Sequence, residues 1–228
     1  MYFNKILVLM MLANTTDSFV VLNTLNKKAI HNNVCLKSNN DDSPIRTNEE
    51  ASIIQEINNE IYYYGPIVQQ GCFELKNKLN ELDMKSKIVA IQYGIDPPPI
   101  RLHLQSQGGT LYHTLYIMDL IKNLDTPVYT YVDGFAASAA SLICVVGKKR
   151  YMTKNSLILI HQLSGADSGK YEELKDQLSN MNSLMQIIVN IYLNHTMMTL
   201  EELNTLLRKD IWLNSSTCLK YGLIDKII

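Results

Sequence analysis

Several features that mark common classes of protein are absent from this sequence. It has no Walker-type glycine loop, no zinc-type spacing of cysteine and histidine, and no stripe of basic residues. The formal net charge is −1, which argues against a nucleic-acid partner because binding to a polyanion depends on clustered positive charge. We therefore expect no metal, no other cofactor and no ATP site within this chain.

Cysteine is scarce, and the early apolar run is short. The four cysteines are widely scattered, a usage that fits buried thiols in a reducing compartment better than a disulfide framework. They are Cys35, Cys72, Cys144 and Cys218. The apolar run from Ile6 to Ala13 is far shorter than the roughly 20 residues that span a bilayer, so no membrane partner is expected.

The first 45 residues differ from the rest of the chain. The run from Ile6 to Ala13 suits the core of a signal peptide, and residues 1–40 hold four lysines against Asp17 alone. A signal-like core followed by a basic stretch resembles the two-part leader of proteins imported into plastids of secondary origin. We expect residues 1–45 to be such a leader or a disordered extension, which leaves a plastid or a cytoplasmic location open.

Residues 46–228 are expected to form one folded domain. Apolar spacing predicts a helix over Glu49–Asn59, a strand over Glu60–Tyr64 and a helix over Val68–Leu82. Strands near residues 100–105, 128–132 and 157–161 alternate with helical patterns at 110–124 and 138–146, and the longest predicted helix is Tyr171–Asn194. This alternation predicts an α/β fold with a mostly parallel sheet.

One constellation of residues carries catalytic chemistry. A serine hydroxyl needs an imidazole to take its proton and a carboxylate to orient that imidazole, and the chain offers Ser138, His161 and Asp210 in that order. Small residues around Ser138 allow a tight turn into a helix, whose first N–H groups would face the serine. The N–H groups of Gly109 and Ala139 are candidates for an oxyanion hole. Spacing alone does not separate this reading from ordinary helix packing around a serine.

Five motifs in one order resemble the Clp protease proteolytic subunit (ClpP) family of serine peptidases. The resemblance as a whole runs from about Gly65 to Ile228 and is strongest after Arg101, where the motifs lie. They are Ser106-Gln107-Gly108-Gly109, Gly134-Phe135-Ala136-Ala137-Ser138, Asn155-Ser156 with Ile160-His161-Gln162, Lys209-Asp210, and Tyr221-Gly222-Leu223-Ile224-Asp225.

The resemblance implies a ClpP/crotonase-like fold of repeated ββα units with a protruding handle helix at residues 171–194. It also implies an endopeptidase of unfolded proteins that works in stacked seven-membered rings of itself or related subunits, fed by a Clp-type AAA+ unfoldase. The triad would be Ser138, His161 and Asp210, with Gly109 and Ala139 as oxyanion donors. Substrate would bind as an added β-strand against the backbone of Gly108, Gly109, Gln162, Leu163 and Gly165.

Four departures from the family pattern, and two rivals, qualify this interpretation. Gln107 stands where the family has proline, Ala139 and Ala140 where it has methionine and glycine, Leu163 where it has proline, and Lys209 where it often has an arginine that helps to lock two rings together. Lysine lacks the planar fork of arginine, which puts assembly control in question. A catalytically inactive ring subunit would share the same fold. A crotonase-type acyl-CoA enzyme would share the architecture but not the Ser/His/Asp set.

Overall fold

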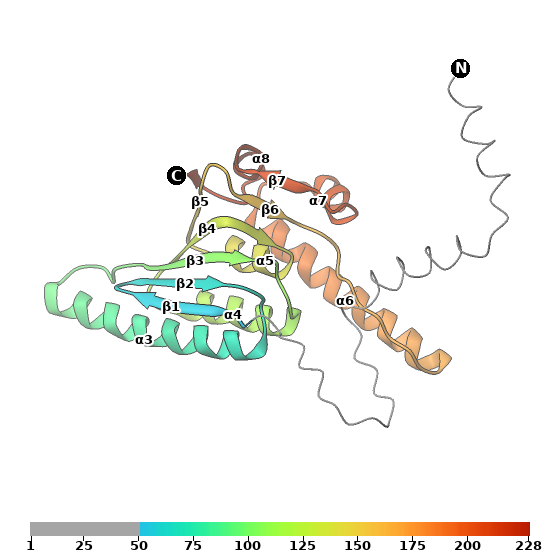
Figure 1. Cartoon of the computed structure of the whole chain (residues 1–228), viewed down its shortest axis with the longest axis horizontal. Helices are drawn as coiled ribbons and strands as arrows, with labels where there is room; N and C mark the ends of the chain where they lie inside the picture. The colour runs from blue at the N-terminus through green and yellow to red at the C-terminus, as the bar shows by residue number, and fades with distance from the viewer. Residues whose placement is uncertain (1–50) are drawn as a thin grey trace, which may run out of the picture. The chain divides into compact units, whose positions relative to one another are not determined.

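The computed structural model describes residues 51–228, which form a mixed α/β unit built on one twisted sheet (Figure 1). The expected leader, residues 1–45, lies outside the described residues, as does Cys35. The main path of the sheet runs in the order β1-β2-β3-β4-β5-β8, and β6 and β7 branch from β4. The strand bounds are β1 Ile53–Ile57, β2 Glu60–Tyr64, β3 Ile100–Ser106, β4 Val128–Ala137, β5 Lys149–Met152, β6 Leu157–Leu159, β7 Trp212–Asn214 and β8 Lys226–Ile227.

The predicted helix over Glu49–Asn59 is wrong, because the described part of this stretch forms strand β1. β1 pairs antiparallel with β2, so that Ile53 lies opposite Tyr64 and Ile57 opposite Glu60. The two strands are joined by a two-residue turn in which Asn58 has a φ of 57°. Asparagine tolerates this left-handed backbone, which two-residue hairpins require. The isoleucine spacing that suggested a helix therefore belongs to a β-hairpin.

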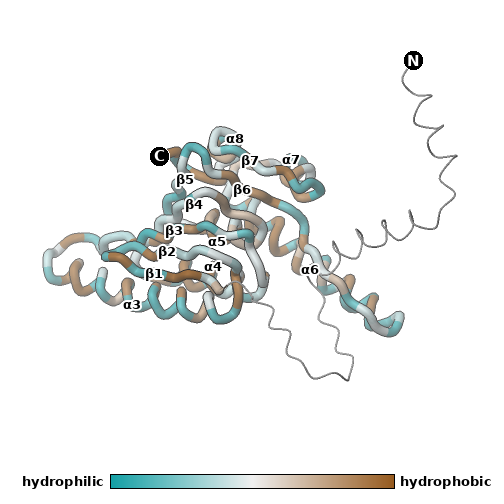
Figure 2. Tube along the Cα trace, viewed as in Figure 1, coloured by the Kyte–Doolittle hydropathy of each residue, from teal (hydrophilic) through white to brown (hydrophobic). Residues whose placement is uncertain are grey.

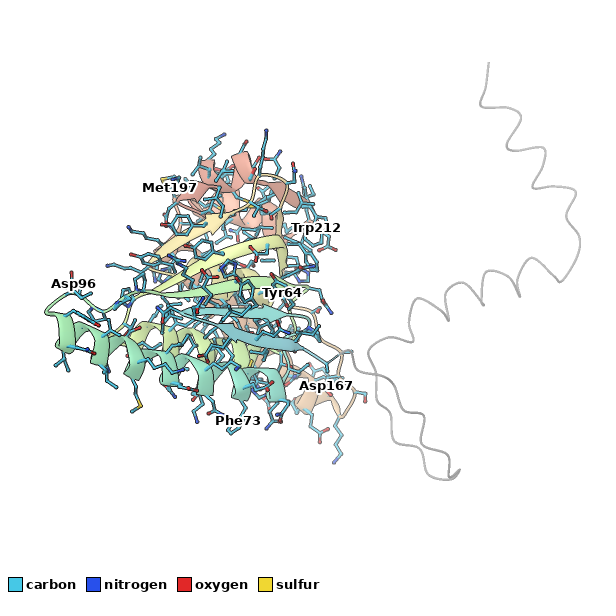
Figure 3. All side chains as sticks on the ribbon, turned by 60° about the vertical axis from the view of Figure 1, so that its left-hand side comes forward. Tyr64, Phe73, Asp96, Asp167, Met197 and Trp212 are labelled. Carbon is cyan, nitrogen blue, oxygen red and sulfur yellow. The ribbon has the colours of Figure 1, made fainter. Side chains whose placement is uncertain are left out.

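Helix α3, Gln69–Tyr93, begins where the prediction placed it but continues eleven residues past the predicted end at Leu82. Its first half packs on the sheet through Leu75, Leu79 and Leu82, and its second half extends beyond strands β1 and β2 (Figure 1). The helix ends at Gly94, which adopts a left-handed φ of 64°. The proline-rich connector after it holds Asp96 at the far tip of this extension (Figure 3).

The rest of the sheet confirms the predicted parallel arrangement. The β2–β3, β3–β4, β4–β5, β4–β6 and β5–β8 pairs are parallel. Within residues 51–228, only the β1–β2 and β6–β7 pairs are antiparallel. Helices α4, Leu111–Asn123, and α5, Ala139–Val145, cross between parallel strands as predicted. Because β4 pairs with both β3 and β6, the ends of these three strands meet in one place. That place holds the candidate site.

Helix α6, Tyr171–His195, confirms the longest predicted helix and has two unlike halves. Its C-terminal half is anchored in the core by Ile188, Val189 and Tyr192. Its N-terminal half projects from the sheet (Figure 1), and apolar residues recur along it (Figure 2), among them exposed Leu174 and Leu178. After α6 the chain forms α7, Leu200–Leu207, then β7, then α8, Ser215–Lys220, and ends with β8.

Candidate active site

Ser138 lies at the tight turn between strand β4 and helix α5. Its backbone has φ 53° and ψ −126°, a combination that non-glycine residues rarely adopt. Its N–H donates a 2.9 Å hydrogen bond to the carbonyl of Leu159 in β6, and its own carbonyl accepts one of 3.0 Å from the N–H of Ser141. The turn is thus held from both sides, and such strained backbone is typical of functional positions.

The two glycines after β3 lie in close backbone contacts, Gly108 against this turn and Gly109 against Ile67. A Cβ placed on Gly108 would lie 2.7 Å from the carbonyl oxygen of Ala137 and 2.9 Å from the backbone nitrogen of Ala139. One placed on Gly109 would collide with the backbone of Ile67. Both positions also have positive φ, 95° and 155°, so only glycine fits here without displacing the backbone.

The two predicted oxyanion donors flank the serine. Gly109 and Ala139 line the same cavity as Ser138. Among residues 51–228, no backbone oxygen outside regular helix and strand bonding accepts a hydrogen bond from either N–H. Both N–H groups thus have no backbone acceptor in this part of the chain, as an oxyanion donor requires.

His161 follows strand β6, and the next residue fixes the chain there. The N–H of Gln162 donates a 2.8 Å hydrogen bond to the carbonyl of Leu207 in α7. The Nδ1 atom of His161 lies 3.4 Å from Oδ1 of Asp210, which stands between α7 and β7. The Asp210 side chain is 80% exposed, whereas that of His161 is 26% exposed. The pair is thus formed at the protein surface, with the imidazole turned inward and the carboxylate turned out.

A cavity of about 340 Å³ joins these groups. Its lining includes Ser138, His161 and the candidate substrate-binding residues Gly109, Gln162, Leu163 and Gly165. Gly108 and Asp210 are not part of the lining; Gly108 packs beneath the turn and Asp210 stands behind His161. Within the described residues, Ser138 and His161 share the cavity without a direct hydrogen bond. Catalytic hydrogen bonds are often long in unliganded enzymes and tighten when substrate binds.

The chain matches the Clp protease family model over residues 58–228. The chain belongs to the Clp protease family. Two similar relatives are the ATP-dependent Clp protease proteolytic subunit of Deinococcus radiodurans, 34% identical over 131 residues, and the ATP-dependent Clp protease proteolytic subunit 1 of Protochlamydia amoebophila, 33% identical over 134 residues. Each match covers 57% of this chain, and it covers 64% of the first relative and 65% of the second, just under two thirds of their lengths.

A solved structure of a ClpP1 mutant from Listeria monocytogenes has the same fold. It superimposes with a TM-score of 0.65 at 24% sequence identity and covers 75% of this chain and 91% of that one. This likeness confirms the expected ClpP-like α/β fold, in which α6 occupies the position of the protruding handle helix.

The predicted substrate-binding segment of this Clp protease family member is an open stretch of chain. Residues 164–170 are exposed and form no regular structure between His161 and α6. Leu163 is anchored at one end, where its N–H lies 3.1 Å from the sulfur of Met185. Asp167 lies near the projecting half of α6 (Figure 3), and it also contributes to the cavity. The backbone of this stretch is therefore free to pair with another extended chain.

The apolar wall of the cavity was not predicted from the sequence as part of the site. Leu142 comes from α5, and Leu184, Ile188 and Tyr192 come from α6. Their signal in the sequence was the four-residue spacing from Ser138 to Leu142 and along Leu184, Ile188 and Tyr192, which places each set on one helix face. The sequence showed the helical pattern of these residues, but it did not show that they lie against the cavity beside Ser138.

A second His–Asp pair, formed by His103 and Asp133, was not predicted from the sequence. Nδ1 of His103 lies 2.8 Å from Oδ2 of Asp133, on the neighbouring strand β4. The ring stacks between Tyr62 and Tyr131 at centroid distances of 4.6 Å. The two residues are 30 positions apart, so no local spacing in the sequence indicated the pair.

Other sources of reactivity in the described residues are limited. Cys72, Cys144 and Cys218 are free and buried, as predicted. Burial raises the pKa of the Cys72 thiol to about 11 and those of Cys144 and Cys218 to about 12, so none is a thiolate near neutral pH. Between residues 51 and 228, no three metal-binding side chains lie close enough to hold an ion, and no helix is long and apolar enough to cross a membrane.

Proposed function

We propose that this chain is a serine endopeptidase, the proteolytic subunit of a Clp-type protease. The observation that carries the proposal is the shared cavity: a serine on a strained turn, a histidine paired with a carboxylate, and two free N–H groups all meet there. Membership of the Clp protease family supports a peptidase of this type.

The mechanism follows from the placement of these groups. Nε2 of His161 takes the proton of Ser138 Oγ as that oxygen attacks the peptide carbonyl, while Asp210 keeps the other ring proton on Nδ1 and stabilises the imidazolium. The N–H groups of Gly109 and Ala139 stabilise the negative charge on the carbonyl oxygen. His161 then returns its proton to the leaving amine, and water, activated by the same histidine, releases the acyl group from Ser138.

The geometry of the cavity favours extended peptides with little sequence preference. Gly109 on one side, and Gly165 with the carbonyl groups of Gln162 and Leu163 on the other, offer backbone groups on which a substrate strand would be held. Gly108 supports this arrangement from beneath the serine turn. Leu142, Leu184 and Ile188 form an apolar wall for one substrate side chain. Backbone pairing with one side-chain pocket suits the degradation of unfolded proteins to short peptides.

Assembly into stacked seven-membered rings is part of the proposal. Leu174, Leu178 and Ile187 on α6 are 41%, 60% and 42% exposed, a large apolar surface for an isolated chain. Packing α6 against a second ring of this chain or of related subunits would cover it. A Clp-type AAA+ unfoldase would deliver substrates, and a plastid leader in residues 1–45 would set the location.

An inactive ring subunit remains the second candidate function. The exposed Asp210 and its 3.4 Å separation from His161 favour it, because a loosely held carboxylate orients the imidazole poorly. In that case the chain would supply fold and contacts to a mixed ring and leave cleavage to its neighbours.

Labelling of the full-length chain with a fluorophosphonate, in the assembled fraction isolated by size exclusion, separates the two functions. We expect covalent labelling in the wild type and in Ser164→Ala, a serine in the lining of the same cavity, and none in Ser138→Ala. An assembled wild-type particle that takes up no label would contradict the peptidase proposal and favour the inactive subunit.

A further inference from the structure

The carbonyl of Ser138 receives more support than a helix N-terminus normally provides. It accepts hydrogen bonds from both the N–H of Ser141, at 3.0 Å, and the hydroxyl of Ser141, at 2.6 Å. The Ser141 side chain is fully buried on α5. Its Oγ in turn lies 2.7 Å from the hydroxyl of Tyr192, which is 2% exposed on α6.

The direction of these hydrogen bonds is fixed by chemistry. A carbonyl oxygen only accepts, so the single hydroxyl proton of Ser141 is committed to Ser138. The hydroxyl of Tyr192 must then donate to Ser141 Oγ. Burial raises the pKa of Tyr192, so that its hydroxyl keeps this proton near neutral pH. The result is an ordered relay from Tyr192 through Ser141 to the backbone of Ser138.

We propose that Ser141 and Tyr192 are positioning residues for the Ser138 nucleophile, holding its strained turn from two different helices. The proposal rests on the peptidase function above and deepens it. Neither side chain reacts; each acts through the backbone that carries Oγ of Ser138.

Strain at the turn is the reason that this support matters. A non-glycine residue in an unfavourable backbone region is strained and persists only when the surrounding contacts hold it there. At Ser138 the N–H is held by β6, and the carbonyl is held by Ser141. Removing the hydroxyl contact leaves the Ser138 carbonyl with the Ser141 N–H as its remaining donor. The turn is then held less firmly, and small shifts there displace the serine from the histidine and from the oxyanion donors.

Tyr192 anchors the far end of the relay. Its backbone carbonyl accepts hydrogen bonds from the N–H of Thr196, at 2.9 Å, and from the Thr196 hydroxyl, at 2.7 Å, at the end of α6. Tyr192 also belongs to the cavity lining. Because its hydroxyl is already engaged by Ser141, loss of that hydroxyl alone changes the position of the nucleophile and leaves the apolar wall of the cavity in place.

The test compares Tyr192→Phe, Ser141→Ala and the double variant in the full-length chain, with Thr130→Val as the matched control. The Thr130 hydroxyl is also buried and also bonds a carbonyl of α5, that of Cys144, at 2.8 Å, but it does not touch the serine turn. Two quantities are measured: the rate of fluorophosphonate labelling against reagent concentration, and amide hydrogen exchange in the peptide that contains Ser138.

We expect Ser141→Ala and Tyr192→Phe to lower the maximal labelling rate by up to about tenfold, with the half-saturating concentration unchanged. Exchange at the Ser138 amide should rise in both. The double variant should have the same labelling rate and amide exchange as Ser141→Ala, because the Tyr192 hydroxyl acts through Ser141. Thr130→Val should alter neither quantity.

Two results would overturn the proposal: unchanged exchange at Ser138 in both single variants, or an equal rise in Thr130→Val. A wild type that takes up no label contradicts the peptidase function, and the exchange data then still decide whether the two hydroxyls hold the turn.

Discussion

Two His–Asp pairs lie within residues 51–228, one on the outer face of the sheet and one at the cavity. The His103–Asp133 pair is the closer of the two, with 2.8 Å between Nδ1 and Oδ2, against 3.4 Å for His161 and Asp210. Yet His103 is enclosed by the rings of Tyr62 and Tyr131, and its Nε2 atom is buried without a hydrogen-bond partner among the described residues. A well-formed pair is therefore not enough to mark a catalytic histidine.

What separates the two histidines is the side of the ring that faces away from the carboxylate. His161 lines a cavity together with Ser138 and with Gly109 and Ala139, the two proposed oxyanion donors. At His103 that side of the ring faces Glu60, whose Oε2 atom is 3.9 Å away and is already bonded by the Tyr62 hydroxyl. The same pair of residue types thus serves packing at one place and, in our proposal, proton transfer at the other.

The sharpest way to break this comparison is to remove each ring in turn. His161→Ala should lower the fluorophosphonate labelling rate by about 1,000-fold or more, because the serine loses its base. His103→Ala should keep the rate within about twofold and lower the free energy of unfolding by about 2 kcal/mol, through lost stacking and a lost hydrogen bond.

Labelling kinetics and urea denaturation of both variants check this pair of expectations. A His103→Ala protein that remains folded but labels as slowly as His161→Ala would show that the outer pair contributes to the chemistry, and the distinction drawn here would fail.

A smaller effect is expected from the glycines that bring β3 and β4 together beside the serine. Gly108→Ala would press its Cβ against the backbone of Ala137 and Ala139 and should cost about 3 kcal/mol, with labelling reduced about 100-fold. Gly134→Ala is the matched control, since its φ is also positive, 84°, but its Cβ would meet nothing closer than Gln105 at 3.8 Å.

Gly134→Ala should cost only the backbone strain, about 1 kcal/mol, and leave labelling nearly unchanged. Thermal unfolding and labelling rates measured side by side decide the matter. Equal losses in the two variants would mean that strain, and not contact with the serine turn, sets the requirement for glycine.

The smallest effect concerns acid stability around His103. Hydrogen bonds from Tyr62 and Arg101 lower the pKa of Glu60 below its ordinary value of 4.5. The stability that Glu60 contributes is therefore present above pH 4.5 and is lost as pH falls through the lower folded-state pKa. Glu60→Gln removes this titration. It should therefore reduce the loss of unfolding free energy on acidification by about 0.5 kcal/mol, a small value because the carboxylate is partly exposed.

Urea denaturation at pH 6 and at pH 3.5 measures this difference directly. Arg101→Gln, which removes one of the two donors to Glu60, should reduce the same pH dependence by part of that amount. If Glu60→Gln lost as much unfolding free energy between pH 6 and pH 3.5 as the wild type, the lowered pKa of Glu60 would not be the cause.

The proximity of Ser138 and His161 was predictable from the sequence, because it follows from the parallel arrangement of the strands that precede them. Both follow strands of a parallel sheet, β4 and β6, and Ala137 pairs with Leu159 just before them. Carboxyl ends of adjacent parallel strands lie at one edge, so residues after them are neighbours. Asp210 joins them because β7 pairs with β6 and brings Trp212 opposite Leu159.

Other features depend on tertiary contacts that spacing does not reveal. Ser141 and Tyr192 are 51 residues apart, and their bond exists only because α5 and α6 cross. The extension of α3 past Leu82 carries no core pattern, since Ile88 and Ile91 are exposed, and ion pairs such as Lys87 with Asp83 accompany it. The β1 strand was misread because isoleucines at three-residue spacing suit either a short helix or a twisted hairpin.

The buried thiols described above give this chain a built-in set of unfolding reporters. Cys72 lies on α3, Cys144 on α5 and Cys218 on α8, and each is shielded in the folded state. A thiol that is buried reacts with an alkylating reagent only when its surroundings open, so the rate of its modification measures the free energy of that opening. Mass spectrometry of the separate peptides would therefore report, without any introduced probe, which layer of the molecule opens first as it unfolds.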